Sequence, residues 1–219
     1  MIAARTIGHA HEQVIRNILL DGFEVTTEDG EETLELPLPL HLHITYPSEE
    51  PKVSDCCLFK PGFMEEYTQK VLGITPARDD GKDFSYTYGN RLNHHPSLPK
   101  GVNQIKEICR KLIINPQTRR AILHTWSPGI DLFMKDCPCL QTIQFLIRDN
   151  LLNMILTFRS QDALSALGAN LYALQRLQET VAEGVSVKSG SIDLFVASSH
   201  IYHKRDALEL MRFRKKLNV

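Results

Sequence analysis

Apolar residues at alternate positions dominate the second half of the chain. They stand at every second position over 143–147 and again over 152–158, with Asp149 and Asn150 between the two runs. Alternation of this kind is typical of half-buried strands, and an Asp-Asn pair suits the tight turn that joins them. We therefore predict a β-hairpin here.

Apolar residues three or four positions apart predict three amphipathic helices. One spans 102–113, and a basic one spans 204–217. The longest follows the hairpin and ends near Gly184. Its apolar stripe consists of Leu164, Leu167, Leu171, Leu174 and Val181. After this helix, alternation over 192–196 predicts another strand, which ends at 198–202.

Polar residues stand where the hairpin meets the long helix. Ser160 is a suitable N-cap residue for that helix, and Asp162 would then lie in its first turn. A helix N-terminus presents free N–H groups and the positive end of a dipole. Arg159 and Ser160 are therefore a candidate phosphate site.

The first half of the chain is less regular. Leucine alternates with other residues over 34–46, which predicts a strand, and two prolines there favour the edge of a sheet. Residues 60–100 predict loop with one short helix around 63–72, and 121–126 predicts a short buried strand. Hairpins and helices in this order indicate an α+β fold, a mixed or antiparallel sheet with packed helices. We expect one domain over 1–219.

Composition excludes several classes of protein. The net charge is −1, so no global attraction to nucleic acid or to an anionic membrane is expected. No apolar run approaches the roughly 20 residues that span a bilayer. Residues 1–14 lack the apolar core of a secretory signal, so we expect a cytoplasmic protein.

The five cysteines are more consistent with free thiols than with disulfides. Their number is odd and no export signal accompanies them. Cys137 and Cys139 are too close together for ordinary zinc-ligand spacing, and His41 with His43 supplies only two ligands. We therefore expect no metal site.

Several short elements follow one another in a recognisable order. Residues 115–170 contain an Arg-Arg pair, a tryptophan, Pro-Cys, Arg-Ser-x-Asp and an asparagine, and His-x-Tyr follows within 198–202. Upstream, 85–92 carries Tyr-Gly. Together these elements resemble the thymidylate synthase and deoxycytidylate hydroxymethylase family, over slightly more than half of the chain. The resemblance implies a thymidylate synthase-like fold.

The resemblance assigns the reacting groups. Cys139, the cysteine of Pro-Cys, matches the nucleophile that adds to carbon 6 of a pyrimidine, and a thiolate can both attack and leave. Tyr88 matches the tyrosine near the proton taken from carbon 5. Arg159 matches an arginine that binds the nucleotide phosphate and favours the thiolate.

It also assigns the binding groups. Ser160 matches a second phosphate ligand, and Arg119 and Arg120 match a pair that reaches the phosphate of a partner subunit, which implies a homodimer, although a monomer is possible. His200 and Tyr202 match the pair that binds the ribose 3′-hydroxyl.

Two further matches concern the base and the one-carbon donor. Asn170 matches the amide that reads the edge of uracil with one donor and one acceptor, whereas an aspartate would suit cytosine. This residue favours deoxyuridylate (dUMP) as substrate. Asp162 matches the residue that contacts the pterin of the donor.

Departures from the family pattern fall mostly on the donor side. Leu140 and Phe158 replace a histidine and a glutamine, and Ala166 replaces a glycine. Residues 27–30 lack the family's phosphate-binding arginine, and 212–219 do not match its C-terminal tail.

The segment that carries a catalytic-site glutamate and two tryptophans is shortened. Glu65 and Glu66 cannot be aligned with that glutamate, and Trp126 is the one tryptophan of the chain. The donor is thus methylene-tetrahydrofolate or a modified reduced pterin, such as the methanopterin of methanogenic archaea.

Three hypotheses follow from the sequence. The first is reductive methylation of dUMP to thymidylate (dTMP). The second is 5-hydroxymethylation of a pyrimidine nucleotide, in which water quenches the exocyclic methylene. The third is a non-catalytic nucleotide-binding relative, against which the joint presence of Cys139, Arg159, Asn170 and Tyr202 argues.

Overall fold

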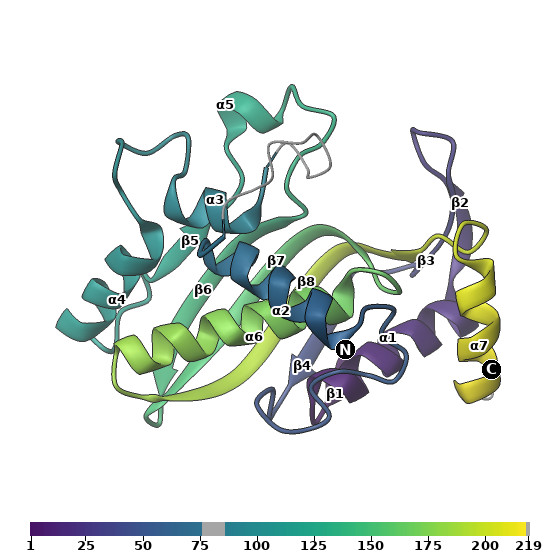
Figure 1. Cartoon of the computed structure of the whole chain (residues 1–219), viewed down its shortest axis with the longest axis horizontal. Helices are drawn as coiled ribbons and strands as arrows, with labels where there is room; N and C mark the ends of the chain where they lie inside the picture. Colours follow the sequence, from purple (N-terminus) through teal and green to yellow (C-terminus); the bar gives the residue numbers. More distant parts are fainter. Residues whose placement is uncertain (76–85, 218–219) are drawn as a thin grey trace.

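The computed structural model describes residues 1–75 and 86–217, and it is built around one large β-sheet (Figure 1). The strands are β1 (Ile2–Ala4), β2 (Phe23–Thr26), β3 (Glu32–Glu35), β4 (Leu40–Ile44), β5 (Ile122–His124), β6 (Leu140–Arg148), β7 (Leu151–Asp162) and β8 (Lys188–Ile201). The helices are α1 (Ile7–Asp21), α2 (Pro61–Leu72), α3 (Tyr88–Asn93), α4 (Gln104–Ile114), α5 (Pro128–Asp131), α6 (Leu167–Gly184) and α7 (Ala207–Leu217).

The sheet mixes parallel and antiparallel pairs. Its order is β1-β4-β8-β7-β6-β5, and the β2–β3 hairpin joins it at β8. The long strands β7 and β8 run parallel, with Phe158 opposite Val196 and Asp162 opposite His200. Strands β4 and β8 are antiparallel, as are β6 and β7. The predicted α+β fold is confirmed.

The predicted hairpin is confirmed as β6 and β7. Asp149 and Asn150 both adopt left-handed backbone conformations, with φ of 51° and 59°. Two successive residues of positive φ give a turn whose twist matches that of the flanking strands, and Asp and Asn tolerate this conformation better than most residues. The turn residues therefore account for the register of the hairpin.

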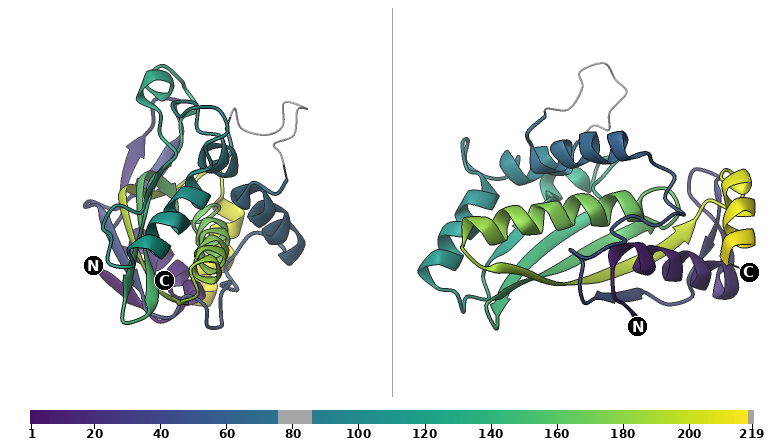
Figure 2. Two further views of the ribbon diagram at one scale, coloured as in Figure 1. Left: turned by 90° about the vertical axis from the view of Figure 1, so that its left-hand side faces the viewer. Right: turned by 60° about the horizontal axis from the view of Figure 1, so that its bottom comes forward.

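The long helix α6 lies on one face of the sheet (Figure 2). Every member of its predicted apolar stripe, from Leu164 to Val181, is at most 1% exposed, and the helix ends at Gly184 as predicted. The central strands contribute the facing layer of the core, including Leu156, Leu194 and Val196. Helix α2 packs on the outer side of α6.

The opposite face of the sheet carries exposed apolar side chains. Phe195, Ile122 and Leu151 are 44%, 40% and 38% exposed. They alternate along their strands with core residues such as Leu123 and Leu194, so they point away from α6.

The prediction of a single edge strand over 34–46 was wrong. The segment forms β3 and β4, and β4 lies between β1 and β8 inside the sheet. Pro37 and Pro39 cannot donate backbone hydrogen bonds, and they fall in the break between the two strands. Helix α2 confirms the helix predicted at 63–72, whereas α3 was not predicted.

Ser160 is not the N-cap of the long helix. Strand β7 continues through Asp162 because its pairing with β8 extends to that residue, and α6 begins only at Leu167. Asp162 forms the turn between them by accepting the N–H groups of Leu164 and Ser165. Arg159 and Ser160, the candidate phosphate ligands, therefore lie near the end of a strand and not at a helix N-terminus.

None of the helices in the described ranges is long and apolar enough to cross a membrane.

Candidate active site

A cavity of about 780 Å³ lies where α2 and α6 meet the ends of β7 and β8. Residues far apart in the sequence line it, because β7 and β8 end side by side and α2 covers α6. The cavity brings together these eight residues predicted from the sequence: Tyr88, Cys139, Arg159, Ser160, Asp162, Asn170, His200 and Tyr202.

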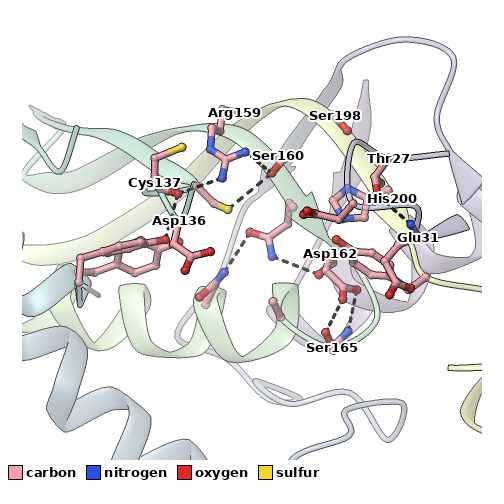
Figure 3. A pocket seen from close by; sticks show the side chains of 18 of the residues that line it. Thr27, Glu31, Asp136, Cys137, Arg159, Ser160, Asp162, Ser165, Ser198 and His200 are labelled. Carbon is pink, nitrogen blue, oxygen red and sulfur yellow. Dashed lines mark hydrogen bonds between the residues drawn. The ribbon is translucent and has the colours of Figure 1, made fainter. Parts of the chain in front are cut away.

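The thiol of Cys139 lies beside the C-terminal part of β7. Its Sγ atom is 3.5 Å from the Oγ atom of Ser160. Arg159 binds the segment that carries the cysteine: its Nε donates to the Pro138 carbonyl (3.2 Å) and its Nη2 to the Cys137 carbonyl (2.9 Å). Its Nη1 also donates to Ser160 (Figure 3). One guanidinium thus fixes the cysteine segment against the strand and places a positive charge near the thiol.

Two tyrosines lie beside this segment. The hydroxyl of Tyr88 accepts the backbone N–H of Leu140 (3.3 Å), and the hydroxyl of Tyr86 donates to the Cys137 carbonyl (3.3 Å). Burial raises the pKa of both phenols well above their usual value, and the neighbouring Cys139 adds to this effect. Both phenols therefore stay protonated near neutral pH.

The amide of Asn170 lies in the cavity wall between two other polar side chains. It is 6% exposed. Its Oδ1 accepts the hydroxyl of Tyr67 at 2.6 Å, and its Nδ2 donates to Oε1 of Gln161 at 3.0 Å. Tyr67 comes from α2 and Gln161 from β7, so three elements meet at this amide.

Asp162 and His200 lie at the other end of the cavity (Figure 3). Asp162 forms an ion pair with Arg205 at 2.8 Å and also accepts the hydroxyl of Ser165. The Arg205 guanidinium lies 4.0 Å from the centre of the Tyr202 ring. Burial lowers the pKa of His200, which keeps its ring neutral near pH 7.

Arg119 and Arg120 do not line the cavity. Both are exposed in the turn before β5. The carbonyl of Arg119 accepts from Gln144, and the backbone N–H of Arg120 donates to Thr118. Within one chain, the structure does not bring this pair to the other predicted residues.

The charged residues of the cavity lining can be compared with the departures from the family pattern. Glu65 and Glu66 are exposed and do not line the cavity. The turn between β2 and β3 does line the cavity, through Thr27 and neighbouring acidic residues. None of these lining residues is an arginine that could replace the family's phosphate-binding arginine. The cationic residues of the lining within the described ranges are Lys70, Lys135, Arg159 and Arg205.

Tyr67, Gln161 and Arg205 were not selected from the sequence. Phe63, Tyr67 and Lys70 all line the cavity from one face of α2, at the i, i+4, i+7 spacing of a helix. That spacing is visible in the sequence, but only the docking of α2 on α6 shows that it faces a site.

In 1–75 and 86–217, no group of three or more His, Cys, Asp or Glu side chains is arranged to hold a metal ion. His41 and His43 instead flank the carboxylate of Asp193, with nitrogen–oxygen distances of 3.5 and 2.9 Å.

Comparison with known proteins identifies the family. The family model described as thymidylate synthase matches residues 63–216. A protein of Methanococcoides burtonii is 35% identical over 211 residues, which cover 95% of this chain and 93% of that protein. A protein of Methanocaldococcus jannaschii is 36% identical over 206 residues, which cover 92% and 90%. Both are provisionally named as thymidylate synthases. The chain belongs to the thymidylate synthase family.

Proposed function

We propose that this protein is a thymidylate synthase that converts dUMP to dTMP with a reduced pterin as one-carbon donor. The observation that carries the proposal is the shared cavity, in which the thiol of Cys139, the guanidinium of Arg159 and the amide of Asn170 lie together. These groups supply a nucleophile, an anion ligand and a base-reading edge.

The chemistry begins at the thiol. The thiolate of Cys139 adds to carbon 6 of uracil, and the electron pair of the 5,6 double bond makes carbon 5 nucleophilic. Carbon 5 takes up a methylene unit and loses its proton near Tyr88, and the bond between the methylene carbon and the donor nitrogen breaks. The thiolate then leaves carbon 6 as hydride adds to the methylene carbon. The donor supplies the methylene unit and the hydride that completes the methyl group.

The nucleotide is bound by the groups around the thiol. Arg159 and Ser160 bind the phosphate. His200 and Tyr202 bind the ribose 3′-hydroxyl. The neutral ring of His200 is suited to this role because a neutral imidazole can donate or accept a hydrogen bond.

The donor is methylene-tetrahydrofolate or a modified reduced pterin of the methanopterin type, and Asp162 contacts its pterin ring. The departures from the family pattern on the donor side support the second alternative.

Hydroxymethylation is the second candidate. No tryptophan lines the described part of the cavity, so fewer bulky side chains would keep water away from an exocyclic methylene. Asn170 still favours uracil over cytosine as the base.

The proposal is tested by incubating pure protein with dUMP tritiated at carbon 5 and a panel of reduced pterins, followed by mass analysis of the nucleotide. Tritium release with one donor and a methylated product is expected. A hydroxymethylated product would replace the first function by the second. No release with any donor would leave a nucleotide-binding protein.

A further inference from the structure

A chain of hydrogen bonds crosses the cavity wall and ends on a backbone carbonyl. Nε2 of Gln161 donates to the carbonyl of Asp162 at 3.1 Å, and Oε1 of Gln161 accepts from Nδ2 of Asn170 at 3.0 Å. Oδ1 of Asn170 accepts the hydroxyl of Tyr67 at 2.6 Å. Gln161 and Asn170 are 2% and 6% exposed, so little water reaches these bonds.

The backbone carbonyl fixes the polarity of the whole chain. A carbonyl oxygen can only accept, so the NH₂ group of Gln161 must face Asp162 and its oxygen must face Asn170. The NH₂ group of Asn170 must then face Gln161, which turns Oδ1 toward Tyr67. Burial raises the pKa of Tyr67 far above neutrality, so its hydroxyl keeps the proton that it donates.

An asparagine with this orientation presents one kind of edge to the cavity. One N–H of Asn170 and one lone pair of its Oδ1 remain after the bonds to Gln161 and Tyr67. They match the carbonyl and the N3–H of uracil. Cytosine offers an acceptor at N3 and a donor at its amine, so it fits only if the amide rotates by 180°.

A free asparagine would rotate at little cost, but this one is restrained. After rotation, Oδ1 of Asn170 would face Oε1 of Gln161. Rotation of Gln161 as well would turn its oxygen toward the Asp162 carbonyl. Tyr67 restrains Asn170 less, because a hydroxyl can also accept a hydrogen bond.

We propose that Gln161 and Tyr67 are specificity-determining residues that hold the amide of Asn170 in the orientation for uracil and against cytosine, with Gln161 the stronger of the two. This inference rests on the proposed function, because it assumes that Asn170 reads the base. Both are positioning residues, since they act through Asn170.

The test compares dUMP and dCMP binding in the full chain by calorimetry. Gln161→Met keeps the length of the side chain but removes both polar groups. We expect the dUMP/dCMP affinity ratio to fall by about tenfold, the loss expected for one or two buried hydrogen bonds, with a smaller fall in Tyr67→Phe. Tyr86→Phe is the matched control, because it removes another hydrogen-bonded phenol hydroxyl from the lining of the same cavity. Its ratio should equal that of the wild type.

The outcomes separate the inference from the proposed function. An unchanged ratio in Gln161→Met and Tyr67→Phe, even with weaker binding of both nucleotides, overturns the inference and leaves dUMP as substrate. Wild-type protein that does not prefer dUMP overturns the proposed function and the inference with it. If thermal melting shows that Gln161→Met does not fold, Tyr67→Phe decides alone, and its ratio must fall by at least about threefold.

Discussion

Cys139 and Ser160 are 21 positions apart in the sequence, yet the Sγ atom of one lies 3.5 Å from the Oγ atom of the other. The two residues meet because β6 and β7 form a hairpin, and Arg159 closes its end by binding the carbonyls of Pro138 and Cys137. In the function we propose, the nucleophile Cys139 and the phosphate ligands Arg159 and Ser160 therefore lie together at one end of this hairpin.

Cys139→Ser should abolish turnover and leave dUMP binding largely intact. A serine hydroxyl has a far higher pKa than a thiol and does not add to carbon 6, but it occupies nearly the same volume. Tritium release from labelled dUMP measures the first effect, and calorimetry measures the second.

Alkylation provides an independent check on this cysteine. Cys56 is fully buried, and burial raises the pKa of Cys56, Cys57 and Cys109. Cys139 should react first, and dUMP should protect it. Equal labelling of all five thiols with no protection would count against its role as nucleophile.

Much of this site follows from local sequence patterns. The alternation over 152–158 and 192–196 places β7 and β8 in the core, and the register that pairs Asp162 with His200 brings two short motifs side by side. Motifs that end neighbouring parallel strands meet at the same edge of a sheet, which brings Ser160 and Asp162 beside His200. The residues themselves were selected by the family resemblance, and eight of those ten share the cavity.

Local sequence patterns do not show which distant segments pair or pack together. Serine is a common N-cap residue, but the pairing between β7 and β8 extends past Ser160. The backbone there is therefore hydrogen-bonded as part of a strand and does not begin a helix. Tyr67 contacts a residue 103 positions away, and only the docking of α2 on α6 creates that contact. Local propensity cannot report either interaction.

Asn170→Asp should shift the preference from dUMP toward dCMP. The carboxylate loses the donor that meets the uracil carbonyl and gains an acceptor for the cytosine amine. It would also face Oε1 of Gln161, so both nucleotides should bind more weakly than to the wild type. Competition binding measures the shift. Unchanged relative affinity would show that residue 170 does not read the base.

Protonation of His11 should destabilise the fold in mild acid. His11 is buried, its Nε2 donates to the Ala163 carbonyl at 2.8 Å, and no described group bonds its Nδ1. Burial therefore lowers the pKa of His11 below its usual 6.5. As pH falls below 6.5, the unfolded chain binds a proton that the folded chain does not, so stability is lost by up to about 1.4 kcal/mol per pH unit.

Urea unfolding between pH 7.5 and 5 measures this dependence. His11→Gln keeps a donor for the Ala163 carbonyl but does not titrate, so its stability should depend less on pH than that of the wild type. His9→Gln, which replaces an exposed histidine of the same helix, should retain the wild-type dependence. An unaltered slope in His11→Gln would contradict the assignment.

The last prediction concerns a twofold homodimer. The sheet face opposite α6 exposes Phe195, Ile122 and Leu151, and Arg119 and Arg120 stand exposed before β5 on the edge strand. In a twofold dimer formed through this face, the second subunit would cover these exposed apolar side chains.

In such a dimer, the arginine pair would complete the phosphate site of the partner subunit. Mixing Arg120→Ala subunits with Cys139→Ser subunits should therefore recover activity, because each heterodimer contains one site with both an intact cysteine and an intact arginine. Each variant alone should be inactive or nearly so. A protein that sediments as a monomer while it still turns over dUMP would exclude shared sites, and Arg159 with Ser160 would then have to bind the phosphate dianion without the pair.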